Sequence, residues 1–118
     1  MSNEMQELLP GGSVRWVLSK EERQSIAESL DIEEHTFSKL KGNIMTRTRE
    51  ACQECGKLSG LDDFIQNAME MGVHSRDFII DVLHHGPQAA SPAHGLQCSK
   101  CGEHFEGVWA WETEDWAQ

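Results

Sequence analysis

The sequence lacks a long apolar run, and this absence excludes a large class of proteins. No stretch approaches the roughly 20 consecutive apolar residues that a membrane-spanning helix needs. The first residues, MSNEMQELLPGG, are acidic and short of apolar side chains, so they do not resemble a secretory signal. We therefore expect a cytoplasmic protein without membrane contact, whose cysteines stay reduced.

The chain also lacks the sequence patterns of familiar active sites. It has no Gly-rich phosphate loop, no Ser or Cys nucleophile with an evident base, and no carboxylate pair with a clear role. Hydrophobic residues make up 38% of the 118 residues, so the core is expected to be modest and to need an additional constraint. These features predict a binding protein and not an enzyme.

Positive charge is scarce as well. The 10 Lys and Arg residues face 20 Asp and Glu residues, and the net charge of −10 disfavours nucleic acid as a partner of the whole chain. The basic residues are unevenly distributed, however. Residues 15–49 hold seven of them against six acids, and residues 50–118 hold three against twelve. The first segment could approach a polyanion, whereas the second suits a protein partner or self-association.

Cysteine is rare too, but all four cysteines occur in two copies of one pattern, C-x-x-C-G. Two thiolates three positions apart can reach one ion when the backbone between them turns tightly, and the glycine that follows suits this turn. Two such turns supply four sulfurs, which is a preferred tetrahedral ligand set of structural zinc. The predicted zinc ligands are Cys52, Cys55, Cys98 and Cys101.

Both cysteine pairs resemble the metal-binding knuckles of the zinc-ribbon and rubredoxin-like families, and the stretch CSKCGEHFEG is especially similar to them. Four sulfurs around one ion make a closed structural site, without the open position that a catalytic metal needs. The interval between Cys55 and Cys98 holds 42 residues, which is too long for the short hairpin of a compact ribbon. We therefore expect a helical insertion between the two knuckles.

Other ligands and other metals stay open at this point. The same four sulfurs would also bind iron, and two separate dithiols could act in redox chemistry. Histidines offer further ligands, because two of them flank the second knuckle and three lie in or near predicted helices: His94 and His104, and His74, His84 and His85. With four cysteines available, we expect no histidine ligand.

A second pattern occupies residues 23–43, RQSIAESLDIEEHTFSKLKGN. Ser19 and Glu22 form a predicted capping box for a first helix that ends near Leu30. A second helix is expected from about residue 33 to residue 41. The segment resembles the helix-turn-helix of bacterial regulators, in which the second helix lies in the major groove of DNA.

This resemblance predicts nucleic-acid contacts between residues 33 and 49. The residues expected to reach phosphates or base edges lie on the second helix and on the basic connector after it: Thr36, Ser38, Lys39, Lys41, Arg47 and Arg49. Two features depart from the pattern, since Asp31 stands where the turn usually has glycine, and the acidic Glu33 and Glu34 begin the second helix. The alternative is an ordinary helix pair that packs its own core.

The predicted fold class is α+β, as a small, mainly helical domain with a short β element around the two cysteine knuckles. Residues 61–71 and 75–85 have apolar side chains at helical spacing, with Gly72 and Gly86 after them. Residues 14–18 and the stretch FEGVWAW are predicted to be extended. The expected organisation has three parts: a flexible tail at 1–13, a helix-turn-helix-like segment at 14–49, and a metal-binding module with a helical insertion at 50–118.

Tryptophans gather among acidic residues near the end of the sequence. Trp109 is expected in the core, whereas Trp111 and Trp116 are candidate anchors for a protein partner. These features predict a small zinc-stabilised, DNA-binding transcriptional regulator. The alternative is a non-catalytic acidic adaptor, inhibitor or immunity-type protein that binds a protein partner. A third hypothesis is a sensor that loses its metal when the thiolates oxidise.

Overall fold

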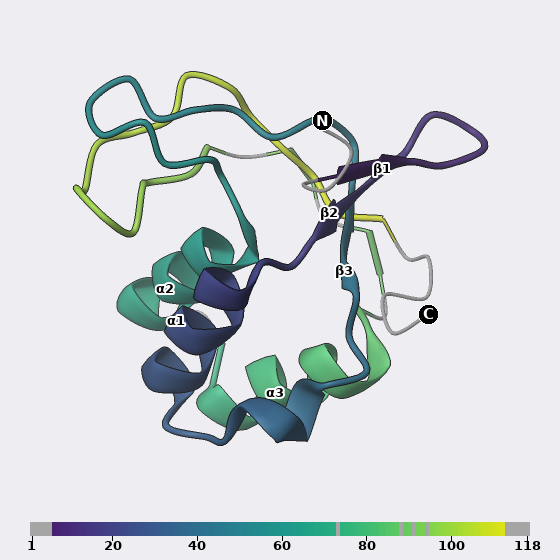
Figure 1. Ribbon diagram of the computed structural model, residues 1–118, viewed down its shortest axis with the longest axis vertical. Coiled ribbons are helices and arrows are strands. Elements are labelled where there is room, and N and C mark those ends of the chain that lie inside the picture. The colour runs from purple at the N-terminus through teal and green to yellow at the C-terminus, as the bar shows by residue number, and fades with distance from the viewer. Residues whose placement is uncertain (1–5, 73, 88, 91, 94, 113–118) are drawn as a thin grey trace.

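The computed structural model describes residues 6–72, 74–87, 89–90, 92–93 and 95–112 (Figure 1). In this part of the chain, a three-stranded antiparallel sheet has the order β1-β2-β3, with β1 at Gln6–Leu8, β2 at Val14–Val17 and β3 at Gly42–Met45. The helices are α1 at Lys20–Leu30, the short 3₁₀ helix η2 at Glu34–Phe37, α2 at Leu61–Met71 and α3 at Arg76–His85. The predicted α+β class is confirmed.

Local sequence signals set the ends of the three α-helices. The hydroxyl of Ser19 accepts a hydrogen bond from the backbone of Glu22, whose carboxylate accepts one from Ser19 in return, so the predicted capping box is present. Gly72 ends α2 in the left-handed conformation, and Ser75 caps α3 through its hydroxyl. These helices lie where the sequence predicts them.

The prediction of a second α-helix between residues 33 and 41 is wrong. Only the η2 turn forms there, and the chain then enters β3. The guanidinium of Arg23 on α1 donates to the carbonyl oxygens of Phe37 and Leu40, which a continuing helix would use for its own bonds. Gly42 follows in contact with the backbone of β2, where an added Cβ would lie 1.9 Å from the Trp16 carbonyl oxygen. Sheet pairing therefore overrides the helical pattern in this segment.

Both ends of the described chain add to the sheet. Residues 6–8 pair with β2 as β1, although the sequence predicts a flexible tail there, because the Pro-Gly-Gly turn folds them back onto β2. The stretch FEGVWAW is extended as predicted only toward its end, where residues 110–112 bond to residues 44–46, at the end of β3 and just after it. Thr46 N–H donates to the Ala110 carbonyl at 3.0 Å, and Glu112 N–H donates to the Ile44 carbonyl at 3.0 Å. Strand β3, the last in the sheet order, therefore has partners on both sides.

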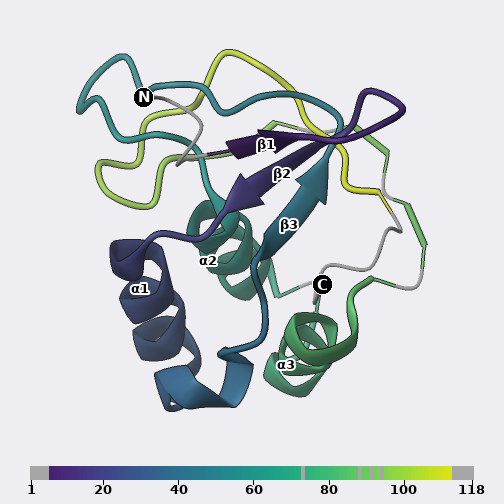
Figure 2. The same ribbon diagram turned by 45° about the vertical axis from the view of Figure 1, so that its right-hand side comes forward.

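The core lies between the sheet and the helices, and it joins the two predicted segments 14–49 and 50–118. Trp16 of β2 is fully buried, with Phe64 of α2 at 6.0 Å and Trp109 at 5.9 Å between ring centroids. Figure 2 shows the helices below the sheet and two loops running together beyond the start of α2. These two loops, residues 50–60 and 95–105, carry the four cysteines.

Candidate metal centre

The two cysteine loops have the same backbone structure. In the first, Gly56 N–H donates to the Cys52 carbonyl at 2.8 Å, and in the second Gly102 N–H donates to the Cys98 carbonyl at 2.9 Å. The φ angles of the two glycines are +80° and +84°, a region that other residues enter only at a cost. Glycine is therefore needed to turn the chain back toward the first cysteine of each pair.

Each loop is also closed at its base by matching bonds. The N–H groups of Cys52 and Cys98 donate to the carbonyls of Lys57 and Glu103 at 2.8 and 2.7 Å. Antiparallel bridges join residue 51 to residue 58 and residue 97 to residue 104, one step further out. The repeated pattern C-x-x-C-G thus folds into two copies of one knuckle, as the sequence predicts.

The two knuckles bring the four sulfurs together. All four Sγ atoms lie within 4.8 Å of one another, with Cys52 and Cys101 at 3.5 Å and Cys55 and Cys98 at 3.6 Å. A disulfide would need about 2.0 Å. A zinc ion bound at about 2.3 Å in a tetrahedron would place its sulfurs roughly 3.8 Å apart. The four cysteines therefore fit one tetrahedral metal ion.

The thiols are electrostatically unequal. The backbone N–H of Cys55 is the main influence that lowers the pKa of Cys52 to about 7, although burial opposes it. Burial raises the pKa of Cys98. The backbone N–H of Glu103 lowers the pKa of Cys101, but burial and the neighbouring sulfurs outweigh it and raise that pKa to about 12. Protons therefore compete with a metal ion for these sulfurs, as expected of a thiolate site.

Asp63, in the first turn of α2, connects the helix to both knuckles. Its side chain is fully buried. Oδ2 accepts hydrogen bonds from the Gly60 N–H at 2.8 Å and from Lys57 Nζ at 2.9 Å, just after the first knuckle. Oδ1 accepts from the N–H of Ser99, inside the second knuckle, at 2.8 Å. Both carboxylate oxygens are therefore used to position the cysteine loops.

Asn67 extends this support one turn further along α2. Its Nδ2 donates to the Gln97 carbonyl at 2.9 Å, and its Oδ1 accepts from the Gln97 N–H at 3.0 Å. Gln97 directly precedes Cys98, so these two hydrogen bonds fix the backbone just before the second knuckle, in the way that pairing with a neighbouring strand would. Such contacts around metal ligands fix their orientation.

Buried charges continue from the knuckles toward α1. Burial raises the pKa of Asp62 to about 6, and the Asp63 carboxylate adds to the effect. Burial lowers the pKa of Lys57, but the carboxylates of Asp63 and Asp62 outweigh it and raise that pKa above its ordinary value. Next to this cluster, Arg49 and Glu22 form an ion pair at 2.8 Å. The metal centre is therefore connected to the core by paired charges.

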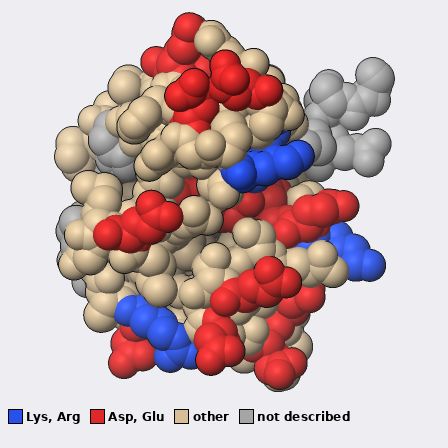
Figure 3. Space-filling view, turned by 90° about the vertical axis from the view of Figure 1, so that its left-hand side faces the viewer, with Lys and Arg blue, Asp and Glu red and all other residues tan. Residues whose placement is uncertain are grey.

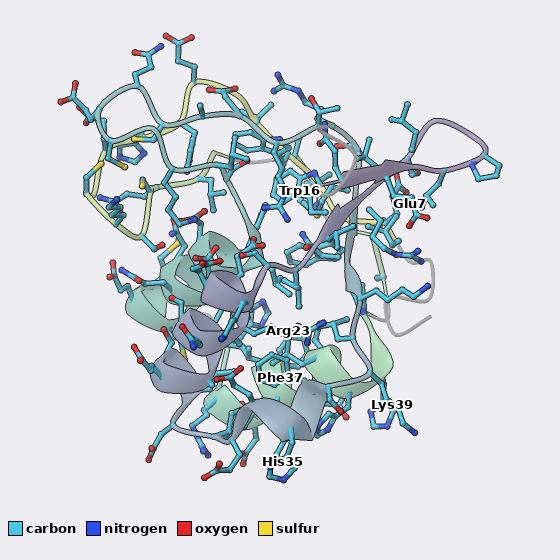
Figure 4. The ribbon with its side chains drawn as sticks, in the orientation of Figure 1. Glu7, Trp16, Arg23, His35, Phe37 and Lys39 are labelled. Carbon is cyan, nitrogen blue, oxygen red and sulfur yellow. The ribbon has the colours of Figure 1, made fainter. Side chains whose placement is uncertain are left out.

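The residues predicted to contact nucleic acid do not form one surface helix. Thr36, Ser38, Lys39, Lys41 and Arg47 are exposed. Figure 4 shows Lys39 and His35 pointing away from the body of the molecule, whereas Phe37 and Arg23 point inward.

The arginines of the connector support the fold. The side chain of Arg49 is only 3% exposed, so it is unavailable to phosphate, and it bonds to Glu22 and to the carbonyls of Val17 and Ser59. The guanidinium of Arg47 lies over the Trp109 ring at 5.5 Å and donates to the Val108 carbonyl. The structure therefore gives both arginines intramolecular partners.

Neither Trp111 nor any of the described histidines belongs to the metal-binding cluster. Trp111 is half-buried, pairs with Met45 and donates to the Ala89 carbonyl at 2.9 Å, while Trp109 is fully buried as predicted. Trp116 and His94 lie outside the described residues. The other four candidate histidines make different contacts. His74 stacks on Phe78, His84 hydrogen-bonds to the Thr36 carbonyl, His85 pairs with Asp81, and the backbone of His104 forms an antiparallel bridge with Gln97. In the described part of the chain, the metal-binding cluster contains cysteines alone.

Sequence reasoning missed the supporting residues Asp63, Asn67 and Ser99. Asp63 was recognisable as an acidic residue in the first turn of a helix, which is a general preference. Nothing in the sequence connects it to Ser99, because that bond depends on how α2 meets a loop 36 positions away.

Comparison with known proteins gives a family without an assigned function. A model described as a domain of unknown function, DUF8243, matches residues 3–117. Neither the curated proteins nor the solved structures contain a match to the chain. Within the described residues, none of the helices is long and apolar enough to cross a membrane.

Proposed function

The chain belongs to the DUF8243 family, and from its cysteine cluster we propose that it is a zinc-stabilised, non-catalytic binding module. The observation that carries this proposal is the approach of the four sulfurs within 4.8 Å of one another on two matching knuckles. Four sulfurs around one ion leave no position for water or substrate, which is the arrangement of a structural zinc site. The ion would join two loops that are far apart in the sequence, in a chain with a modest core.

We propose a protein partner with a basic surface. Exposed acidic side chains outnumber exposed basic ones among the described residues, and they lie on the helices and on both knuckles. Figure 3 shows many acidic groups and few basic ones on the face that carries α1 and α2. An acidic surface favours association with a basic partner and repels nucleic acid at long range. This supports the acidic adaptor more than the DNA-binding regulator.

DNA binding is the second candidate, and one observation favours it. Lys39 and Lys41 are exposed near the exposed hydroxyl residues Thr36 and Ser38. Against it stand the burial of Arg49 and the replacement of the expected recognition helix by η2 and β3. A helix-turn-helix regulator would need that helix to enter the major groove.

Native mass spectrometry with and without a chelator tests the metal. We expect one zinc ion per chain, lost together with the compact charge states when the chelator is added. A mass that shows one iron ion per chain would change the identity of the proposed metal but leave its structural role unchanged. Masses lower by the protons of two disulfides would contradict the proposal and favour a redox sensor.

Fluorescence anisotropy tests the partner. The zinc-loaded protein is titrated into a labelled Lys- and Arg-rich peptide and into a labelled DNA duplex, at low and at physiological salt. We expect salt-dependent binding of the peptide and none of the duplex. Binding of the duplex that the double substitution Lys39→Glu, Lys41→Glu abolishes would instead support the regulator.

A further inference from the structure

A cavity of about 640 Å³ lies between α2, α3 and the sheet, and none of the four cysteines is among its described lining residues. Its walls include Phe64 of α2, Ile79 of α3 and Met45 of β3. Residues after α3 and near the end of the described chain also line it: Pro87, Ala89, Ala90, Pro92, Gly95 and Trp111. The arrangement of α2, α3 and β3 around this region can be followed in Figure 2. The volume is within the range of roughly 300–1,000 Å³ that small-molecule sites have.

The chemistry of the walls selects a neutral ligand. The described lining residues are almost all apolar, and they include no Lys, Arg, Asp or Glu. A charged group taken into such a cavity would lose its hydration without gaining an opposite charge, which is costly. Two apolar side chains at the cavity, Met71 and Phe78, are 73% and 47% exposed, so an apolar surface is accessible from solvent.

Three of the described lining residues have polar side chains, Asn43, Asn67 and His74, and Asn43 is the most deeply buried of them. Asn43 is 0% exposed and lies in β3, two positions before Met45, so the two side chains point to the same face of the strand. Among the described residues, neither its Nδ2 nor its Oδ1 has a hydrogen-bond partner. A buried amide without partners costs stability, and such groups are rare in native proteins.

The polar neighbours of Asn43 are already committed to other bonds. Trp16 is its cross-strand partner, but the Trp16 indole N–H donates to the Arg47 carbonyl at 2.8 Å. Asn67 also lines the cavity, and its amide holds Gln97 beside the second knuckle. Replacing either bond would loosen the core or the metal centre. The donor and acceptor of Asn43 are therefore unmet, and because the side chain is 0% exposed, a ligand reaches them only when the side chains that cover them move.

We propose that this cavity binds a neutral, mainly apolar small molecule with one carboxamide-like group. The ligand carbonyl accepts from Nδ2 of Asn43, and its N–H donates to Oδ1, while its apolar part contacts Phe64, Ile79 and Trp111. Two adjacent bonds to one amide fix the orientation of the ligand, and the apolar walls supply most of the affinity. The site is separate from the metal centre and does not depend on the partner proposed above.

A titration with octanamide, followed by ¹H–¹⁵N NMR of the zinc-loaded protein, tests the proposal. The indole N–H of Trp111 and the side-chain NH₂ of Asn43 should shift and saturate, while the indole N–H groups of Trp16 and Trp109 serve as internal references. N,N-dimethyloctanamide lacks the N–H donors, so we expect it to bind about tenfold more weakly. Octanoate at neutral pH should bind more weakly than octanamide, because it is charged.

Two variants and one control make the test specific. Asn43→Leu should bind octanamide and its dimethyl analogue equally, and Ala68→Phe should reduce binding of both by filling the cavity from α2. Gln24→Leu adds the same apolar side chain on the exposed part of α1 and should behave as the wild type.

Four results would overturn the proposal. The first is no saturable shift of Trp111 at millimolar octanamide, and the second is equal affinity of the wild type for both amides. The third is an ordered water on Asn43 that octanamide does not displace, since water would then satisfy the amide. Self-association that closes the cavity, detected by concentration-dependent shifts without any probe, would also contradict it.

Discussion

Replacing Asp63 with asparagine tests how the metal centre is coupled to α2. The carboxylate accepts three hydrogen bonds, two on Oδ2 from Gly60 and Lys57 and one on Oδ1 from Ser99. An amide keeps only one acceptor oxygen, so in either orientation its NH₂ group faces an N–H donor. The variant Asp63→Asn therefore loses at least one buried bond and weakens the bond to Lys57.

The magnitude follows from the bonds that are lost. A hydrogen bond to a charged acceptor contributes about 1.5–3 kcal/mol, and breaking a buried ion pair costs about 3–5 kcal/mol. Because Lys57 keeps Asp62 as a partner at 3.1 Å, we expect Asp63→Asn to lower the free energy of unfolding by about 3 kcal/mol. Loss of the bond to Ser99 should also lower metal affinity about tenfold, the smaller effect expected of residues that orient ligands.

Urea unfolding of the zinc-loaded protein, followed by tryptophan fluorescence, measures the stability. Competition with a chelating dye measures the metal affinity. Asp62→Asn is the matched control, because Asp62 accepts its bonds on Oδ1 alone and an amide can keep them. We expect the control not to lower the free energy of unfolding, because burial already disfavours the ionised carboxylate of Asp62. Equal losses of stability and metal affinity in the two variants would refute the assigned role of Asp63.

Three further predictions address the knuckles and the buried charges. Cys98→Ser should lose the bound metal, measured by mass spectrometry, and should melt at a lower temperature; unchanged metal content would contradict the four-sulfur site. Gly102→Ala should cost about 1–2 kcal/mol in urea unfolding because φ is +84°, with Gly102→Asn costing less. As pH rises from 5 to 7, the free energy of unfolding of the wild type should fall by about 1 kcal/mol relative to that of Asp62→Asn, measured by urea unfolding at each pH. The pKa of Asp62 is raised to about 6 in the folded state, so the folded state binds this proton more strongly than the unfolded state, and stability is lost as pH rises through 6. A difference between the two proteins that does not change with pH would contradict this.

The cysteine knuckles were predictable because their information is local. The spacing C-x-x-C-G specifies the turn, and both copies form it with the same bonds. The capping residues Ser19 and Ser75 were predictable for the same reason, since a cap acts within one helical turn.

The segment after α1 was not predictable from local signals. Residues 33–41 have a helical pattern, but the carbonyls of Phe37 and Leu40 accept hydrogen bonds from Arg23, and residues 42–45 pair with β2. Arg49 shows the same difficulty, because a basic connector suggested phosphate contacts and the structure buries the guanidinium against Glu22. In both cases a distant part of the chain determines the outcome, and the sequence does not reveal that contact.

The pairing of residues 110–112 with β3 also protects the molecule from self-assembly. Without this segment, β3 would present a row of free N–H and C=O groups, which can recruit a strand from another molecule. On the opposite border of the sheet, β1 has three residues and an ion pair between Glu7 and Arg15, and short charged borders resist such recruitment. Removal of residues 110–118 is therefore expected to promote aggregation even where the four cysteines still bind their metal ion.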